Sequence, residues 1–321
     1  MAKTPPSRKA PARPGAAKTP ARPVKPRGSR GRPAGLFTWL AVALVVVVVA
    51  TLVVVKVTSG SSPGGSTSFQ AVDAQTMAEL TKVPASVFNA VGVTSTVAAV
   101  TPPTPIKGQP LLASASGGKT LPEVFYLGAN YCPFCAAERW STIIALSRFG
   151  TWHKLGTMES STHSGEIYPG TPTFTFEKAT YSSPYLTFAE VEEYTNQWSN
   201  SAGYYTSLQK PTASQLANFK KYDTSKWIKG YTSQQDYSIP YYSFGNEYLV
   251  GGSSFTPALL ASQSRNQIAA GLKDPTSPVT AAIISTANYL TAATCVLTKN
   301  QPGSVCMSAG VKAANKALGI K

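Results

Sequence analysis

The sequence predicts an α/β domain joined to a membrane by one N-terminal helix, and three observations support this. Residues 36–55 are twenty residues without a charge, which at about 1.5 Å per residue is long enough to cross the hydrocarbon core of a bilayer. Residues 123–129 form a short apolar run, typical of a strand buried on both faces, and a helical pattern begins at Pro133. Further on, Gly-Asn at 245–246 separates two short β-prone runs, as in a β-hairpin.

The first 35 residues are not expected to fold. They contain ten Lys or Arg, eight Pro and no acidic residue, so they have almost no apolar surface to bury. They also carry most of the net charge of +15, because removing those ten from the 29 basic residues leaves 19 against 14 acidic ones. We therefore expect residues 1–35 to be a disordered basic tail and the remainder to have an ordinary charge balance.

A strongly basic flank keeps its side of a membrane helix in the cytoplasm. We therefore expect residues 36–57 to be a single-pass helix in the cell membrane, 58–69 a Gly/Ser linker, and 70–321 an extracytoplasmic domain. A cleaved secretory signal is the alternative. The apolar run is longer than in such signals, and no small-residue cleavage site adjoins its end before Lys56.

Local patterns predict the elements of the domain. Residues 70–91 have apolar side chains at helical spacing and predict one amphipathic helix. Further helices are expected over 133–149, 212–222, 257–270, 278–296 and 308–318, and strands over 123–129, 155–160, 173–180, 241–244 and 247–250.

The four cysteines form two pairs along the chain. Outside the cytoplasm disulfides can form and persist. Cys295 and Cys306 flank a turn-rich loop between two expected helices, which favours a structural disulfide that closes this loop. An electron relay to Cys135 is the alternative role for this pair.

The other pair, Cys132 and Cys135, lies where the expected strand gives way to the helix. Unpaired N–H groups and the helix dipole at a helix N-terminus stabilise an anion, so the first cysteine is expected to supply a thiolate. Cys132 would attack a substrate disulfide and Cys135 would resolve the mixed disulfide. An inert disulfide and half of a metal site are the alternatives. A structural zinc site normally needs four ligands, and only His153 and His163 are available, so we expect no metal.

Residues around the two cysteines are candidates for supporting roles. Glu138 lies three residues after Cys135 on the same helical face, where a buried acid could transfer the proton of the resolving thiol. A solvated position or an ion pair is the alternative for this side chain. Tyr131, Pro133 and Phe134 are candidates for the surface that contacts substrate.

With these features the chain resembles the thioredoxin-like superfamily, whose members pair a strand–Cys-x-x-Cys–helix unit with a cis-proline that starts a β-hairpin. The matching segment is Ser238-Ile239-Pro240, which enters the expected hairpin. The resemblance implies that Pro240 is a cis-proline facing Cys132. It also implies that the backbone of Ile239 binds an extended substrate peptide.

The chain also resembles an uncharacterised prokaryotic family of membrane-anchored thioredoxin-like domains. The resemblance rests on Asn-Tyr-Cys-Pro-Phe-Cys-Ala-Ala-Glu-Arg-Trp at 130–140, Arg-Phe-Gly at 148–150 and Tyr-Ser-Ser-Pro-Tyr at 181–185, and it covers about 70–310. It implies a thioredoxin-like fold with extra C-terminal helices. Because about 80 residues separate the expected strand 155–160 from Pro240, we expect one large insertion before the cis-Pro hairpin.

The sequence therefore predicts a membrane-anchored extracytoplasmic thiol–disulfide oxidoreductase. Its partners would be protein thiols and disulfides and a redox partner that the sequence does not identify, and no organic cofactor is expected. The basic tail could bind anionic lipid or nucleic acid, but its effect on topology is sufficient to explain it, so no nucleic acid is expected. A redox-inactive module that binds peptides in the cleft beside Pro240 is the alternative function.

Overall fold

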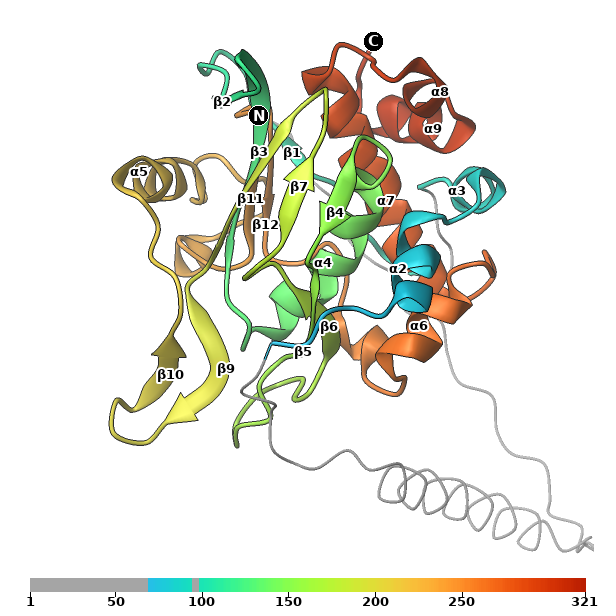
Figure 1. Cartoon of the computed structure of the whole chain (residues 1–321). Coiled ribbons are helices and arrows are strands. Elements are labelled where there is room, and N and C mark those ends of the chain that lie inside the picture. The colour runs from blue at the N-terminus through green and yellow to red at the C-terminus, as the bar shows by residue number, and fades with distance from the viewer. Residues whose placement is uncertain (1–68, 94–97) are drawn as a thin grey trace, which may run out of the picture. The chain divides into compact units, whose positions relative to one another are not determined.

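The computed structural model describes residues 69–93 and 98–321 (Figure 1). The expected basic tail, the membrane helix at 36–57 and nearly all of the linker lie outside the described residues. The described part is a mixed α/β structure with eight α-helices around one main β-sheet.

The helices are α2 (Ala74–Thr81), α3 (Ala85–Val91), α4 (Pro133–Leu146), α5 (Ala213–Tyr222), α6 (Arg265–Gly271), α7 (Pro278–Leu297), α8 (Gly303–Cys306) and α9 (Ala309–Leu318), with short 3₁₀ turns η1 (Ser233–Gln235) and η2 (Pro257–Leu260). The strands are β1 (Thr104–Pro105), β2 (Ala113–Ser116), β3 (Lys119–Gly128), β4 (Thr151–His153), β5 (Gly156–Glu159), β6 (Pro172–Thr175), β7 (Thr180–Ser182), β8 (Thr187–Glu192), β9 (Tyr194–Ser199), β10 (Tyr204–Ser207), β11 (Tyr241–Phe244) and β12 (Tyr248–Gly251).

The main sheet has six strands, in the order β1-β12-β11-β3-β2, with β8 also paired to β3. The carboxyl half of β3 runs parallel to β8, with Glu123–Gly128 opposite Thr187–Glu192. On its other side β3 is antiparallel to β11, which continues into β12. The hairpin turn has positive φ at both Gly245 and Asn246, as a two-residue type I′ turn requires. The predicted hairpin is therefore confirmed.

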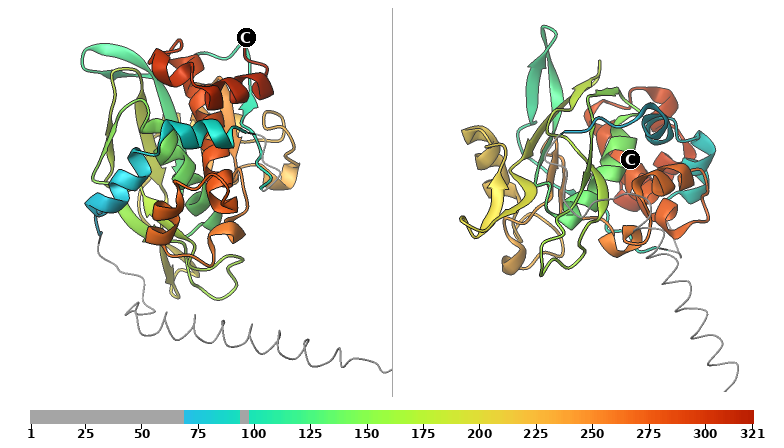
Figure 2. Two further views of the ribbon diagram at one scale, coloured as in Figure 1. Left: turned by 90° about the vertical axis from the view of Figure 1, so that its right-hand side faces the viewer. Right: turned by 60° about the horizontal axis from the view of Figure 1, so that its bottom comes forward.

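Helices cover both faces of the sheet, so β3 is buried on both sides as its apolar run predicts. Successive side chains of a strand point to opposite faces. Val124 and Tyr126 pack into the larger core with α4 and α7, whereas Phe125 and Leu127 pack into a smaller core that includes residues of α5. Figure 1 shows α5 on one side of the sheet and α4 and α7 on the other, and Figure 2 shows the same layers from two further directions.

Helix α7 is the only helix of the described residues that is long and apolar enough to cross a membrane. Its most apolar window is 94% buried inside the protein, and the Ser141 hydroxyl of α4 donates a hydrogen bond of 2.9 Å to Ile283 O on α7. The helix is therefore a core element of this fold, packed directly against α4.

Two of the sequence motifs that are far apart in the chain lie against each other. The Arg-Phe-Gly segment leads into β4, and the Tyr-Ser-Ser-Pro-Tyr segment contains the end of β7, which pairs with β4. The Ser183 hydroxyl donates to Phe149 O at 2.7 Å. A Cβ atom on Gly150 would lie 2.4 Å from Ser182 O, so only glycine fits at this contact. The two motifs together form one packing unit beside α4.

Three expectations about the elements are wrong in detail. The helix expected over 70–91 is two helices, because Pro84 disfavours helical backbone at Val83. The helix expected over 257–270 is divided into η2 and α6, because Ser264 caps a new helix. The segment expected as one half-buried strand over 173–180 is β6, buried throughout, and then β7.

The strand expected at 155–160 is present as β5, which pairs with β6 outside the main sheet. The neighbour of β3 is β8, in a segment whose glutamates do not resemble a buried strand. Segments outside the main sheet therefore lie on both sides of β8. The single insertion expected between 155–160 and Pro240 is thus interrupted by a strand of the main sheet.

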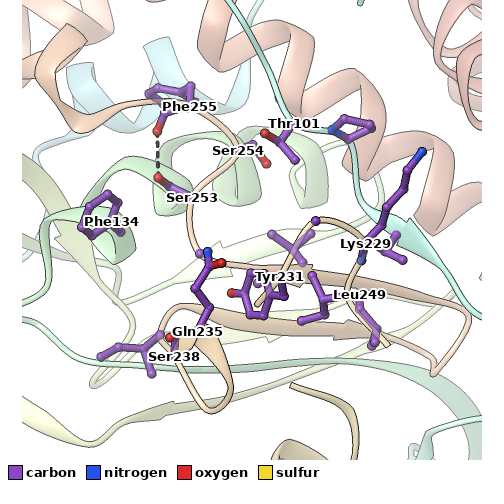
Figure 3. A pocket seen from close by; sticks show the side chains of 18 of the residues that line it. Thr101, Phe134, Lys229, Tyr231, Gln235, Ser238, Leu249, Ser253, Ser254 and Phe255 are labelled. Atoms are coloured by element: carbon purple, nitrogen blue, oxygen red, sulfur yellow. Dashed lines mark hydrogen bonds between the residues drawn. The ribbon is translucent and has the colours of Figure 1, made fainter. Parts of the chain in front are cut away.

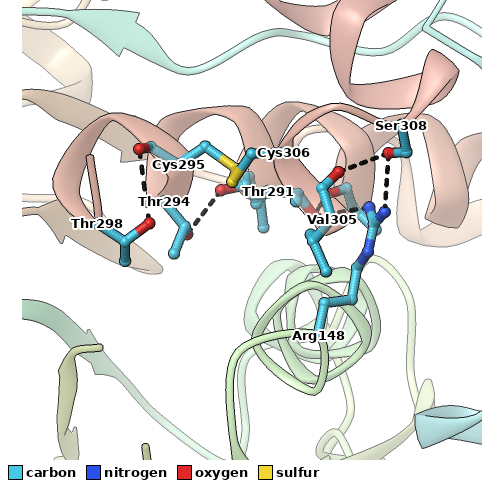
Figure 4. The surroundings of a disulfide bond; sticks show 10 residues. Arg148, Thr291, Thr294, Cys295, Thr298, Val305, Cys306 and Ser308 are labelled. Atoms are coloured by element: carbon cyan, nitrogen blue, oxygen red, sulfur yellow. Dashed lines mark hydrogen bonds between the residues drawn. A yellow bond between two sulfur atoms is a disulfide. The ribbon is translucent and has the colours of Figure 1, made fainter. Parts of the chain in front are cut away.

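The predicted disulfide between Cys295 and Cys306 is present and joins the end of α7 to α8 (Figure 4). Both cysteines are buried. Nearby, the Arg148 guanidinium donates to Thr291 on α7 and to Ser308 ahead of α9, and lies 4.2 Å from the centre of the Phe88 ring. This corner holds the C-terminal helices onto α7.

Replacement of both cysteines of this pair by alanine should lower the free energy of unfolding by about 2–3 kcal/mol, because a closed loop of this length restricts the unfolded chain. Urea denaturation of the full chain would measure the difference. A variant in which Cys132 and Cys135 are both alanine is the control, since these two are free. An equal loss of stability in the control would contradict the structural role of Cys295–Cys306.

Candidate functional site

The two free cysteines occupy the first turn of α4. Cys132 is the N-cap residue, and its sulfur accepts a hydrogen bond from the backbone N–H of Cys135 at 3.3 Å. Pro133 is the first residue of the helix, a position where the backbone N–H has no partner within the helix, so its absence costs nothing. Cys132 is 5% exposed and Cys135 is fully buried. Of these two buried residues, only Cys132 has any exposed surface.

The segment before β11 lies against the first sulfur. The peptide bond between Ile239 and Pro240 is cis, as the sequence resemblance implies. The Cys132 thiol donates to the carbonyl oxygen of Ile239 at 3.7 Å, across 107 residues of sequence. Pro240 itself is buried and Ile239 is partly exposed. The fold thus brings together the Cys-x-x-Cys turn and the Ile-Pro segment.

The two thiols have different acidities. Burial alone would raise the pKa of Cys132, but hydrogen bonds from the side chain and backbone of Cys135, the charge of Arg139 and the N–H of Phe134 lower it below its usual value. Burial and the neighbouring Cys132 raise the pKa of Cys135 well above its usual value, although Arg139 opposes this. Cys132 is therefore the thiol that more readily forms a thiolate.

A buried ion pair lies beneath the dithiol. Arg139 Nε donates to Glu192 Oε1 at 3.0 Å, and Nη2 donates to Glu192 Oε2 at 2.6 Å and to Ala129 O at 2.8 Å. The same carboxylate accepts bonds from the Tyr126 hydroxyl at 3.2 Å and the Phe176 N–H at 3.3 Å. Sequence reasoning missed this pair. The available signal was an arginine one turn after Cys135 in a mostly apolar helix.

Glu138 is fully buried, so the interpretation as a solvated position is wrong. Its carboxylate accepts bonds from the backbone N–H of Ser254 at 2.7 Å and from the Ser254 hydroxyl at 3.1 Å. Burial raises the pKa of Glu138 to about 7, and the two bonds from Ser254 oppose that rise. The structure thus places this carboxyl between α4 and the loop after β12.

Aromatic side chains surround Tyr131, next to Cys132. The Tyr131 ring stacks on Tyr205 with centroids 4.0 Å apart, and its hydroxyl bonds that of Tyr204 at 2.8 Å. These partners come from the β9–β10 hairpin, which stands outside the main sheet. Phe134 contacts Tyr168 edge to face. No local pattern predicts this cluster, because its members come from segments that are far apart in the sequence.

A cavity of about 920 Å³ lies beside the Cys-x-x-Cys turn (Figure 3). Of the predicted site residues, Tyr131, Phe134 and Ile239 line it, whereas Cys132, Pro133 and Pro240 do not. Tyr231 and Phe255 add aromatic surface, and Ser254 connects the wall to Glu138. A mostly apolar cavity of this size with a few polar groups is typical of a ligand-binding site.

Residues 113–296 match the domain of unknown function DUF929, over more than half of the chain. The chain belongs to this family. No curated protein and no solved structure matches it. In the described part of the chain, no three His, Cys, Asp or Glu side chains are grouped as a metal site would need.

The raised pKa of Glu138 predicts a pH-dependent stability. The pKa of this buried carboxyl is about 7 in the folded protein and 4.5 ordinarily. Its contribution to the stability of the folded protein is therefore fully present below pH 4.5 and is lost as the pH rises through 7. Glu138→Gln removes the titration. The difference in unfolding free energy between this variant and wild type should therefore shift in favour of the variant by on the order of 3 kcal/mol between pH 4.5 and pH 8.

Urea denaturation of the full chain at several pH values would measure this shift. Glu247→Gln, at an exposed glutamate, is the matched control and should follow the wild-type profile. A constant difference between Glu138→Gln and wild type across this pH range would contradict the assigned titration.

Proposed function

We propose that this protein is a membrane-anchored thiol–disulfide oxidoreductase whose domain is thioredoxin-like and acts outside the cytoplasm. The order β3-α4-β8-α5-β11-β12-α7 supports the fold assignment. It has the Cys-x-x-Cys turn between a central strand and helix, a hairpin that follows an Ile-Pro segment, and a long helix after the hairpin. The uncharged run at 36–55 and its basic flank support the anchor and its orientation.

One observation carries the functional proposal: the two sulfurs of one helical turn are unequal. Cys132 is slightly exposed and its pKa is lowered, whereas Cys135 is buried and its pKa is raised. An attacking thiol must be accessible and ionised, and a resolving thiol must wait until the mixed disulfide has formed. The arrangement matches this division of roles.

In the proposed reaction the Cys132 thiolate attacks one sulfur of a substrate disulfide. A bond forms between this sulfur and Cys132, and the other substrate sulfur leaves as a thiolate. Cys135 then loses its proton and attacks Cys132, which closes the Cys132–Cys135 disulfide and releases the second substrate thiolate. Two electrons pass from the protein to the substrate, and the reverse sequence oxidises a substrate dithiol.

The cavity supports a polypeptide as substrate. Its wall includes Ile239, whose carbonyl lies beside Cys132, and the aromatic side chains of Tyr131 and Phe134. An extended segment with a cysteine would place its backbone along Ile239 and its neighbouring side chains in the cavity. No organic cofactor takes part in this exchange.

The proposal predicts different defects for the two cysteine variants. In the full chain, Cys132→Ser should abolish insulin reduction and the oxidative refolding of reduced RNase. Cys135→Ser should instead accumulate a mixed disulfide between Cys132 and the substrate, because the resolving thiol is absent. Turbidity, recovered RNase activity and non-reducing mass spectrometry would measure these outcomes. If wild type is active and Cys132→Ser is equally active, the oxidoreductase assignment is wrong.

A peptide-binding module without redox activity is the second candidate, and the cavity beside Ile239 favours it. It would bind extended peptides with equal affinity in wild type and Cys132→Ser. It would also leave insulin and RNase unchanged in both.

A further inference from the structure

Arg139 is the one basic residue of α4, the helix that carries the dithiol. Arg139 lies one turn after Cys135 on α4, and its side chain is fully buried. Its Nη2 binds Ala129 O, and Cys132 N–H donates to the same carbonyl at 3.3 Å. The cation is thus fixed directly beneath the turn that carries both sulfurs.

One donor group of the Arg139 guanidinium remains without a partner beside the ion pair. Glu192 binds Nε and Nη2, but Nη1 is buried and has no hydrogen-bond partner among the described residues. In a buried site with low dielectric, a charge acts on its neighbours far more strongly than in water. An arginine in such a place stabilises any negative charge that forms nearby.

Other ionisable groups also face this position, from every element packed around it. Tyr126 projects from β3, with the Arg139 guanidinium 5.8 Å from its ring centre, and Tyr242 projects from β11. Burial raises the pKa of both phenols well above the usual value, so they stay neutral. Glu138 on α4, whose pKa burial raises to about 7, is bonded to Ser254.

Glu190 on β8 is the remaining carboxyl near this position. Burial and the neighbouring Glu192 raise the pKa of Glu190 to about 8, although Arg139 opposes that rise. Arg139 and Glu192 are the two charges of this group that form a direct ion pair.

We propose that Arg139 is a positioning residue that sets the redox potential of the Cys132–Cys135 couple, and that Glu192 moderates its effect. The inference rests on the proposed function. Reduction of the disulfide takes up two electrons and one proton and yields the Cys132 thiolate and the Cys135 thiol. The oxidised form has no charge on sulfur, so a buried cation favours the reduced form and makes the couple more oxidising.

The test compares neutral replacements of the pair in the full chain, purified in mild detergent. Arg139→Met with Glu192→Met removes both charges and leaves no buried ion alone, a change that folded proteins often tolerate. Arg139→Gln with Glu192→Gln is the second neutral pair, which retains hydrogen-bonding groups. Arg148→Met is the matched control, because Arg148 is a largely buried arginine just after α4 that binds Thr291 and Ser308.

Both neutral pairs should lower the thiolate fraction of Cys132 at pH 7 about tenfold, measured by the pH dependence of alkylation. They should also shift the equilibrium constant with glutathione about tenfold toward the disulfide, which corresponds to about 30 mV. Arg148→Met should change neither quantity. A neutral pair that folds, as judged by circular dichroism, and retains the wild-type thiolate fraction would overturn the inference.

Glu192→Gln alone should change the thiolate fraction of Cys132 in the direction opposite to that of the neutral pairs, because it leaves the Arg139 cation without its counter-charge. The thiolate fraction of Cys132 should rise in this variant, a change that general loosening of the fold does not produce. A fall in the thiolate fraction would also overturn the inference. These measurements need no substrate, so a wild type that fails to exchange with insulin or RNase would reject the proposed function and still leave the role of Arg139 measurable.

Discussion

A buried ion pair between Arg139 on α4 and Glu192 at the end of β8 fixes the place of the two free cysteines. Removal of two charges from water costs several kcal/mol for each ion, and only good geometry with additional hydrogen bonds offsets it. Here the carboxylate has four donors, and the guanidinium also binds Ala129 O, just before the cysteine turn. The same cation therefore holds the strand end, the helix and the neighbouring strand together.

Elements with strong local signals were predictable from the sequence. Pro133 and Cys132 mark the start of α4, Gly245-Asn246 fixes the hairpin turn, and the disulfide closes a short loop between adjacent helices. Each of these depends on residues within about a dozen positions of one another. Strand β8 had no such signal, because Glu192 is acceptable in a buried strand only when Arg139, 53 residues earlier, neutralises it.

The site was predictable to the same extent. The Cys-x-x-Cys turn and the Ile239–Pro240 segment were located by sequence pattern, and the structure brings them within 3.7 Å of each other. The partner of Glu138, by contrast, is Ser254, which lies 116 residues later in an unremarkable loop. The stack of Tyr131 on Tyr205 likewise joins the turn before α4 to strand β10, which no periodicity connects. Contacts made through space between distant segments leave no trace in a local pattern.

Helix α7 illustrates why hydropathy alone gives an incomplete account of this chain. The Thr291 and Thr294 hydroxyls donate to carbonyls four residues earlier in the same helix, so these two polar groups are satisfied within the helix. Its outer side is covered by α3 and α9, where Gly310 packs so closely that a Cβ would lie 2.5 Å from Phe88 O. A hydropathy profile would count α7 as a crossing of the bilayer, whereas its most apolar part is 94% buried inside the protein. The apolar surface of α7 is covered by neighbouring helices and not by lipid. A chain that ended before α9 would expose part of this apolar surface to water.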